Sequence, residues 1–274
     1  MSNTSLAALH VLVTRPLTRP EVQPASQKQE LVSAIEAADG HALHLPLIAI
    51  RQFTPQDNPS QLIARIQNLD NYEILIFVST NAVQHGVFWI EQYWPQFPVG
   101  IQLVAIGPGT ARLLTAALHQ DVLHADAGVT SEDLLQHPLF SDVQGKRIGI
   151  VRGAGGRELL AQTLLQRGAA VDYLEVYERN LVPYKSRAFC DQLRRHRINV
   201  LTVSSAESLL HLAELLGDNK AEMSLLPLIV PSQRVAEQAR ALGFSHVIQA
   251  AGADAASVMT ALKDLAAGFG SGKV

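Results

Sequence analysis

The chain has 274 residues and a net charge of −3 at neutral pH, with 47% hydrophobic and 17% charged residues. This length and balance are typical of a globular protein with one large or two ordinary domains. The weak negative charge gives no electrostatic reason to expect nucleic acid as a partner. With Cys190 as its one cysteine, the chain forms no internal disulfide, which suits a reducing cytoplasm.

Membrane segments are not expected from the sequence. Residues 1–9 lack the basic start and apolar run of a signal peptide. No apolar stretch is long enough to cross a bilayer.

Strand-like and helix-like segments alternate along the chain. The first strand, HVLVTRP, is followed by a helix expected at about 26–38, where apolar residues recur at helical spacing. Strands are predicted at 10–15, 42–49, 73–79, 101–106, 147–151, 170–178, 198–203, 226–230 and 245–249, with a weaker one at 121–124. This alternation predicts an α/β fold with parallel sheets covered by helices on both faces.

The two halves of the chain resemble each other, with a division near residue 145. LVTRP matches IVRG, so that Arg15 corresponds to Arg152 at a spacing of 152 − 15 = 137. FVSTNAV matches VSSAESL, which pairs residues 79–80 with 204–205 at a spacing of 204 − 79 = 125. We interpret the match as an internal duplication, although any two series of β–α units share some likeness.

Two extended, proline-punctuated segments, 45–60 and 172–184, are the expected connections between domains. They carry the sequences LPLIAIRQF and VDYLEVYERNLVP, and such strands can pair with each other. The sequence therefore predicts a β-ladder hinge.

Ligands of open α/β sheets bind at the carboxyl ends of the strands, where helix N-termini offer free amides and a positive dipole. Nearly every predicted strand end carries a hydroxyl, a glycine or an arginine. These residues are Thr14, Arg15, Ser79, Thr80, Asn81, Gly107, Thr110, Arg152, Gly153, Ser204, Ser205, Ser232 and Arg234. Helix capping explains any single hydroxyl, but it explains the two matching arginines less well. The set predicts a cleft between two domains for a ligand with several carboxylates or phosphates.

Cofactor and metal motifs are missing. The glycine clusters at 107–109 and 153–156 lack the last glycine of a dinucleotide fingerprint, and no nucleoside-triphosphate loop is present. The histidines lack the spacing of metal ligands. We therefore expect neither a cofactor nor a metal.

Tyr177 lies in the second connecting segment, which would form the floor of a cleft between domains. Tyr173 and Tyr184 are close competitors, and strand alternation places Tyr173 and Tyr177 on the same face. A tyrosine in such a strand packs more often than it reacts, so the residues alone leave both roles open.

The motifs VLVTRP, FVSTNAV, AIGPGTA, VRGAGGRELL, VYER, VSSAES and PSQRVAEQARALGF, in this order, resemble the uroporphyrinogen-III synthase family of the bacterial type. The resemblance covers about residues 10–265 and rests on order and spacing, because no single motif is diagnostic. It implies two flavodoxin-like domains with parallel sheets, joined by a two-stranded β-ladder hinge. The implied parts are a discontinuous domain of 1–44 plus 182–274, a second domain of 55–171, and hinge strands at 45–54 and 172–181.

The resemblance also implies the reaction. It is the cyclisation of hydroxymethylbilane, a linear tetrapyrrole, with inversion of ring D and loss of water, catalysed by a lyase of haem biosynthesis. No cofactor or metal takes part in it. The expected enzyme is a cytoplasmic monomer that receives its substrate from hydroxymethylbilane synthase and has no nucleic-acid or membrane partner.

The implied roles fall on named residues of this chain. Tyr177 matches the tyrosine proposed in the family to assist departure of the substrate hydroxyl. Acetate and propionate groups would be held by Ser79, Thr80, Asn81, Thr110, Ser204 and Ser205, with Arg15 and Arg152 as the charged candidates. Asn81 stands where some relatives carry a basic residue. The turn at 231–234 departs from the family's Gly-Pro-Thr-Thr pattern, which leaves both Ser232 and Arg234 as candidates.

Two other functions remain open on the sequence alone. One is a non-catalytic two-domain binding protein for a polycarboxylate, against which the missing signal peptide counts. The other is a two-domain transferase or nucleotide-sugar enzyme, which would need a nucleotide loop that is not found.

Overall fold

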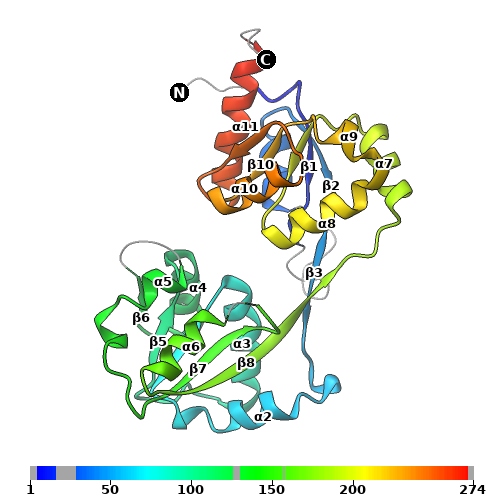
Figure 1. Cartoon of the computed structure of the whole chain (residues 1–274). Helices are drawn as coiled ribbons and strands as arrows, with labels where there is room; N and C mark the ends of the chain where they lie inside the picture. Colours follow the sequence, from blue (N-terminus) through cyan, green and yellow to red (C-terminus); the bar gives the residue numbers. More distant parts are fainter. Residues whose placement is uncertain (1–4, 17–28, 126–129, 157, 271–274) are drawn as a thin grey trace. The chain divides into compact units, whose positions relative to one another are not determined.

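The computed structural model describes residues 5–16, 29–125, 130–156 and 158–270. The chain folds into two compact units, of which unit 1 combines Met1–Ala49 with Asn180–Val274 and unit 2 is Ile50–Arg179. Unit 1 thus contains both ends of the chain, drawn in blue and in yellow to red in Figure 1. The chain passes between the units twice, at 49/50 and 179/180, inside the two segments expected to be hinge strands.

Unit 1 is a five-stranded parallel sheet in the order β11-β10-β9-β1-β2. Its strands are β1 (His10–Val13), β2 (His41–His44), β9 (Val200–Thr202), β10 (Leu228–Val230) and β11 (Val247–Gln249). Its helices are α1 (Glu30–Glu36), α7 (Ser186–Arg195), α8 (Ala206–Leu216), η4 (Gly217–Asn219), α9 (Lys220–Met223), α10 (Gln233–Ala241) and α11 (Ala255–Gly270).

The two faces of this sheet carry separate cores because strand residues alternate. Leu12 points to the core formed with α7, α8 and α10, where Cys190 is also buried. Val11 and Val13 point to the core formed with α1 and α11. Burial raises the pKa of the Cys190 thiol, as expected for a residue with a packing role.

Unit 2 is a six-stranded sheet in the order β3-β8-β7-β4-β5-β6. Its strands are β3 (Ile48–Gln52), β4 (Ile74–Phe77), β5 (Gln102–Ala105), β6 (Val122–His124), β7 (Arg147–Gly153) and β8 (Ala170–Leu181). Its helices are η1 (Pro55–Asp57), α2 (Ser60–Gln67), η2 (Leu69–Asn71), α3 (Thr80–Tyr93), α4 (Pro108–Leu118), α5 (Ser131–Leu134), η3 (Pro138–Phe140) and α6 (Leu159–Gln166). None of the helices in the described ranges is long and apolar enough to span a membrane.

The two connecting segments pair with each other, since β3 lies beside β8. The Phe53 amide donates to the Val176 carbonyl at 3.2 Å, and the Val182 amide donates to the Leu47 carbonyl at 3.0 Å. Leu47 is bonded to Val182 and Phe53 to Val176, so β3 and β8 run in opposite directions. This pair is therefore antiparallel, whereas the other strand pairs of the sheet are parallel.

Some element boundaries differ from the sequence prediction. One strand was expected at 42–49, but β2 ends at His44 and β3 begins at Ile48. Pro46 lies in the gap, and proline cannot donate the backbone hydrogen bond that a continuous strand needs. Residues 26–28 of the first expected helix lie outside the described residues.

The internal duplication is visible in the strand order. The order β8-β7-β4-β5-β6 of unit 2 matches β2-β1-β9-β10-β11 of unit 1. Of these ten matching strands, each half of the chain therefore supplies two to one unit and three to the other. In unit 1, Leu12 of β1 pairs with Leu201 of β9, and in unit 2, Gly149 of β7 pairs with Leu75 of β4. Leu12 therefore corresponds to Gly149, and the spacing of 149 − 12 = 137 is the one that relates Arg15 to Arg152.

The spacing predicted for the hydroxyl pairs is wrong by one residue. The helix N-caps are Ser79 and Ser205, which are 205 − 79 = 126 residues apart rather than 125. Ser204 therefore corresponds to Val78, and only one hydroxyl of each pair caps a helix.

A bulge in β8 decides where its tyrosines point. Arg152 pairs with Glu175 while Gly153 pairs with Tyr177, so β8 has one residue more than β7 at this point. A one-residue shift moves the following side chains to the other face. Tyr173 packs on the core beside α6, whereas Tyr177 contacts His85 of α3 on the opposite face. The prediction that Tyr173 and Tyr177 share a face is therefore wrong.

Asp172 anchors the amino end of the unit 2 sheet. Its carboxylate accepts a hydrogen bond from the Tyr72 hydroxyl at 3.0 Å, and it lies 3.2 Å from the Arg147 guanidinium and 3.3 Å from that of Arg65. Burial, followed by the charge of Asp172, raises the pKa of Tyr72 to about 12.

We predict that Asp172→Asn lowers the free energy of unfolding of unit 2 by about 1–2 kcal/mol, because three donors lose their charged acceptor at a partly exposed site. Both tryptophans, Trp89 and Trp94, lie in unit 2, so their fluorescence in urea reports on this unit. Asp191→Asn, which removes one end of an exposed ion pair on α7 in unit 1, should leave this transition unchanged. Equal transitions in wild type and Asp172→Asn would contradict the anchoring role.

Tyr72 should also make stability depend on pH. An unfolded tyrosine loses its proton near pH 10, whereas the folded state holds that of Tyr72 to about pH 12. The folded state binds more protons in this window, so the stabilisation is complete below pH 10 and is lost towards pH 12. Comparing urea unfolding of wild type and Tyr72→Phe at pH 9 and 11.5 checks this, since the variant should lose less stability over the interval.

Candidate functional site

The carboxyl edge of the unit 2 sheet brings several predicted residues together. β4, β5 and β7 are parallel neighbours, so Ser79 and Gly107, which follow β4 and β5, lie at the same edge as Gly153, the last residue of β7. Ser79 is the N-cap of α3 and accepts a hydrogen bond from the Ala82 amide at 3.1 Å. Gly107 is the N-cap of α4, where no side chain caps the helix amides. Two helix N-termini, each with the positive end of a dipole, thus lie at this edge.

Tyr177 joins this edge through its hydroxyl. The Tyr177 hydroxyl lies 3.3 Å from Ser79 Oγ, and either oxygen can donate in this hydrogen bond. The Tyr177 ring is only 3% exposed and lies 5.4 Å from the ring of His85. His85 Nδ1 is in turn 3.2 Å from Gln52 Oε1 on β3. A continuous hydrogen-bonded path therefore runs from the Tyr177 hydroxyl through Ser79 to the first turn of α3.

Gly153 makes room for the Tyr177 ring. A Cβ atom at position 153 would come within 2.5 Å of that ring, closer than side-chain atoms approach. The Ala154 amide also donates to the Tyr177 carbonyl at 2.7 Å, which holds the strand at this distance. The glycine predicted as a ligand contact thus has a packing role that the sequence did not reveal.

Arg152 points to the other face of the sheet. It is 7% exposed, its guanidinium lies 4.6 Å from the centre of the Tyr173 ring, and its Nε donates to the Gly153 carbonyl at 3.1 Å. It borders a cavity of about 110 Å³ whose other lining residues are mostly apolar: Val78, Ile106, Ser131, Ile150, Leu160, Ala161 and Tyr173. A buried cation beside an apolar wall is suited to a carboxylate on a short alkyl stem.

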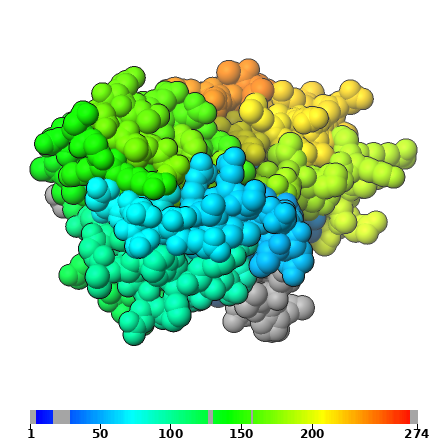
Figure 2. All heavy atoms as spheres, turned by 90° about the horizontal axis from the view of Figure 1, so that it is seen from below, coloured from blue at the N-terminus to red at the C-terminus, as the bar shows by residue number. Residues whose placement is uncertain are grey.

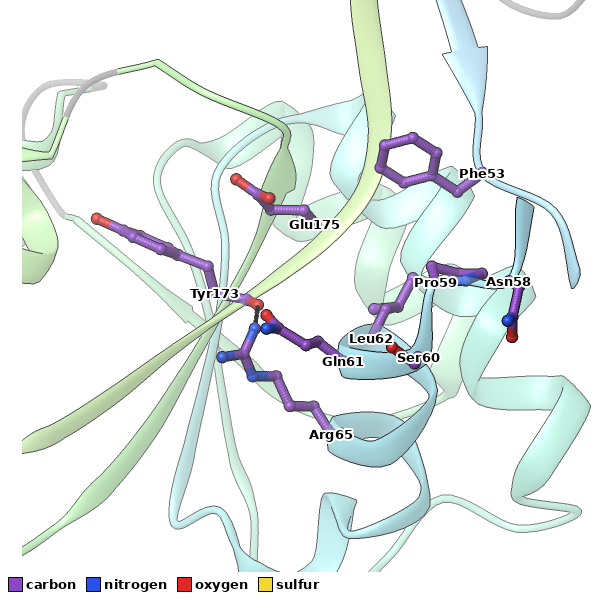
Figure 3. Close-up of a pocket in the computed structure, with 9 residues that line it drawn as sticks. All are labelled: Phe53, Asn58, Pro59, Ser60, Gln61, Leu62, Arg65, Tyr173 and Glu175. Carbon is purple, nitrogen blue, oxygen red and sulfur yellow. Dashed lines mark hydrogen bonds between the residues drawn. The ribbon is translucent and has the colours of Figure 1, made fainter.

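A larger pocket lies beside β8 on the α2 side and was not predicted. It has a volume of about 310 Å³ and is lined by Phe53, Asn58, Pro59, Ser60, Gln61, Leu62, Arg65, Tyr173 and Glu175 (Figure 3). The Arg65 guanidinium donates to the Tyr173 carbonyl at 2.7 Å, which is drawn in Figure 3. Seen from below in Figure 2, residues around α2 form a light blue and cyan part of the surface. Seven of the nine lining residues lie within 53–65, and β8 completes the pocket with Tyr173 and Glu175.

Thr14 does not belong to the open edge of unit 1. Its side chain is fully buried, and its hydroxyl donates to the Thr202 carbonyl at 2.8 Å. The Thr202 hydroxyl donates to the Leu12 carbonyl at 2.8 Å in return. This pair of bonds ties β1 to β9, so the prediction of a ligand contact for the Thr14 side chain is corrected to a structural role.

Arg15 stays at the carboxyl edge of unit 1. It is half-buried, and its carbonyl lies 2.9 Å from His44 Nε2. Two hydrogen bonds from Ser257 lower the pKa of Asp254, and the positive charge of Arg15 contributes to the same shift. Arg15 therefore lies near the start of α11, where its charge is partly balanced.

The predicted hydroxyls of unit 1 cap helices. Ser205 accepts from the Ser208 amide at 3.1 Å, and Ser232 accepts from the Val235 amide at 3.4 Å. Both remain half-buried, as does Ser204, whereas Arg234 is exposed in the first turn of α10. Capping is thus shown for Ser205 and Ser232, and a role of these hydroxyls in binding stays a prediction.

The remaining predicted donors lie in the first turns of α3 and α4. Thr80 is exposed, and Thr110 is half-buried in the first turn of α4. Asn81 Oδ1 is buried without a hydrogen-bond partner among the described residues. A buried acceptor of this kind is costly unless a donor reaches it, which makes Asn81 a candidate for binding an N–H group.

No group of three or more histidine, cysteine or acidic side chains within the described residues is placed to hold a metal ion.

Comparisons with known proteins place these features in a family. The family model for "Uroporphyrinogen-III synthase HemD" matches residues 29–260. The uroporphyrinogen-III synthase of Escherichia coli (strain K12) is 34% identical over 260 residues, covering 93% of this chain and 100% of that protein. The enzyme of the same name from Proteus mirabilis is 32% identical over 201 residues, covering 73% of this chain and 96% of that protein.

Solved structures give the same result for the fold. A mutant uroporphyrinogen III synthase from the extremely thermophilic bacterium Thermus thermophilus aligns with a TM-score of 0.58 at 16% identity, covering 93% of this chain and 99% of that one. The uroporphyrinogen-III synthetase of Helicobacter pylori 26695 aligns with a TM-score of 0.55 at 15% identity, covering 95% and 99%. At such identities these structures support the α/β fold alone.

We predict that Gly153→Ala lowers the free energy of unfolding of unit 2 by about 1–3 kcal/mol, because the added methyl group overpacks the Tyr177 ring. Gly109→Ala is the matched control, since a Cβ there meets nothing within 4 Å and alanine favours the α4 helix. Urea unfolding followed by tryptophan fluorescence separates the two. If both variants unfold like the wild type, the close approach at Gly153 does not constrain the ring.

Proposed function

Since the chain belongs to the uroporphyrinogen-III synthase family, we propose that it closes hydroxymethylbilane to uroporphyrinogen III, with inversion of ring D and loss of water. The observation that carries this function is the family match over residues 29–260 together with relatives above 30% identity. The protein is accordingly a lyase of tetrapyrrole biosynthesis. The alternative of a non-catalytic binding protein is not favoured by any of the comparisons.

The chemistry sets what the protein must do. Loss of the hydroxyl from ring A, assisted by the pyrrole nitrogen, gives an electrophilic azafulvene. Unguided closure joins the unsubstituted end of ring D and gives the symmetrical isomer. Formation of the type III product needs the substituted carbon of ring D at the electrophile, which leads through a spiro intermediate. The protein therefore acts mainly by positioning, with electrostatic help for the leaving group.

The Tyr177–Ser79 pair is the proposed source of the proton for the leaving hydroxyl. Tyrosine and serine hydroxyls carry their protons at neutral pH and can donate. Ser79 is more accessible than Tyr177, and the two are joined by one hydrogen bond of 3.3 Å. In this proposal a proton passes to the departing oxygen to form water. The negative charge left on the pair lies at the N-terminus of α3, where the helix dipole stabilises it.

The carboxylates of the substrate are proposed to bind at the strand ends. The N-termini of α3, α4, α8 and α10 offer backbone amides beside Thr80, Asn81, Thr110, Ser204, Ser205 and Ser232. Arg152 and its apolar cavity suit a propionate or acetate group, and Arg15 and Arg234 supply further charge. That one substrate molecule contacts donors of both units stays a prediction.

We further propose that the enzyme works as a monomer in the cytoplasm and receives hydroxymethylbilane from the synthase that makes it. The instability of this substrate, which closes to the wrong isomer by itself, supports such a transfer.

The reaction is tested by an isomer assay. The purified chain is given freshly generated hydroxymethylbilane, the products are oxidised, and the type I and type III uroporphyrins are separated by chromatography. We expect predominantly type III. Type I alone, formed at the rate of a protein-free control, would overturn the proposed function.

We predict that Tyr177→Phe lowers kcat by roughly ten- to hundredfold, because it removes one proton donor while the positioning groups remain. The product should still be type III. Tyr184→Phe is the matched control: it removes the hydroxyl of a half-buried tyrosine packed against Phe189 in unit 1, and it should keep full activity. An unchanged kcat in Tyr177→Phe would exclude the phenol from the mechanism.

A further inference from the structure

A third pocket lies at the amino edge of the unit 1 sheet. It has a volume of about 260 Å³. His10 and His41 line it from the first positions of β1 and β2, and Arg195, His196 and Arg197 line it from the end of α7 and the turn that follows. The carboxyl edge of unit 1, where substrate carboxylates are proposed to bind, is at the other end of these strands.

The lining of this pocket is basic. The rings of His10 and His41 are stacked with centroids 4.5 Å apart, and His10 Nδ1 lies 3.0 Å from the His196 carbonyl. Within the described ranges, neither Arg195 nor Arg197 has an ion pair, and no carboxylate lines the pocket. The neighbouring Arg194 differs, because its guanidinium is bound by Asn219 and Glu222 on η4 and α9.

The amino edge of the unit 2 sheet corresponds to this edge of unit 1, and its basic side chains are balanced by the carboxylate of Asp172. With the spacing of 137, His10 of β1 corresponds to Arg147 of β7, since 10 + 137 = 147. The backbone amide of His10 donates to Asn199 Oδ1 at 2.8 Å, and that of Arg147 donates to Glu73 Oε2 at 2.6 Å. The equivalent positions in the two sheets therefore have the same local geometry.

The acid that neutralises this edge in unit 2 has no counterpart at the equivalent position of unit 1. Asp172 lies beside Gly149 on β8, and Leu43 lies beside Leu12 at the equivalent place on β2. In unit 2, Asp172 binds two guanidinium groups and a phenol. In unit 1, His10 stands at the position of Arg147, and the apolar Leu43 stands at the position of the carboxylate. The described part of the chain therefore leaves this cluster of basic groups without an anion.

The dipole of α7 does not account for the whole cluster. The C-terminal end of a helix attracts cations with about half an elementary charge, and this effect fades beyond the last turn. It explains basic residues such as Arg194 and Arg195, whereas His10 and His41 come from two separate strands. Arg197 adopts a φ of 52°, in the left-handed region that glycine occupies at the lowest cost, so an arginine is not the residue that this backbone favours.

We propose that this pocket binds a small oxyanion of the carboxylate or phosphate type. The guanidinium groups of Arg195 and Arg197 would bind its oxygens, since planar guanidinium groups match such anions in two-pronged hydrogen bonds. The histidine pair forms the wall beside it. The site is separate from the proposed catalytic edge, and this inference goes beyond the proposed function.

The test uses the full chain with inorganic phosphate and, in a second arm, citrate, at constant ionic strength so that general screening cancels. Nuclear magnetic resonance of ¹⁵N-labelled histidine rings gives a local readout that the carboxyl edge does not share. His10→Asn and His41→Asn identify the two resonances. We expect saturable shifts of both signals with at least one anion, and the arm that responds identifies the phosphate or the carboxylate type.

Variants then separate binding from folding. Arg195→Gln combined with Arg197→Gly should weaken the saturation about tenfold or more, because two charge-assisted contacts are lost. Glycine suits the φ of residue 197, so Arg197→Gly should keep the melting temperature or raise it. Arg194→Gln is the matched control, with unchanged saturation. The proposal is overturned if neither anion shifts the His10 and His41 signals, or if the double variant binds as tightly as the wild type.

Discussion

The candidate site depends on the parallel pairing of β7 with β8. This pairing shifts by one residue at Gly153. Up to Arg152 the two strands run in register, with Tyr173 and Arg152 on the α6 face. Beyond the shift, Tyr177 turns to the α3 face, where its hydroxyl meets Ser79. The shift therefore puts the apolar cavity beside Arg152 on one face of the sheet and the Tyr177–Ser79 hydroxyl pair on the other. Gly153 permits this because any side chain there would collide with the Tyr177 ring.

The exchange of strands between the two halves gives each unit a carboxyl edge built from both halves. In unit 2, Ser79 comes from the first half and Tyr177 from the second, and their hydrogen bond joins the two halves directly. In unit 1, Thr14 and Thr202 also join the two halves, by exchanging hydroxyl-to-carbonyl bonds between β1 and β9, the strands equivalent to β7 and β4. The hydroxyl pair of unit 2 joins β4 to β8, whereas the pair of unit 1 joins β1 to β9 and is buried.

The amino edges diverged in the same manner. In unit 2, Asp172 draws Tyr72, Arg65 and Arg147 into a closed ionic cluster that holds the start of the sheet. In unit 1, Leu43 takes the place of that acid, and the histidine and arginine side chains surround an open pocket. The positive charge at this edge is balanced by Asp172 in unit 2, and in unit 1 it is proposed to be balanced by a bound anion. Comparison of the two copies reveals this difference, because neither sheet shows it alone.

The sequence by itself determined the strand and helix alternation, the duplication, the correspondence of Arg15 with Arg152, and the family. These follow from hydrophobic periodicity and short motifs, which are local properties of the chain. It also placed Ser79, Gly107 and Gly153 at strand ends. Only the tertiary structure decided that Tyr173 and Tyr177 lie on opposite faces, since a bulge changes the alternation without any mark in the sequence. The burial of Thr14, the contact of Gly153 with Tyr177 and the basic lining around Arg195 depend on residues distant in the chain, so no local pattern could predict them.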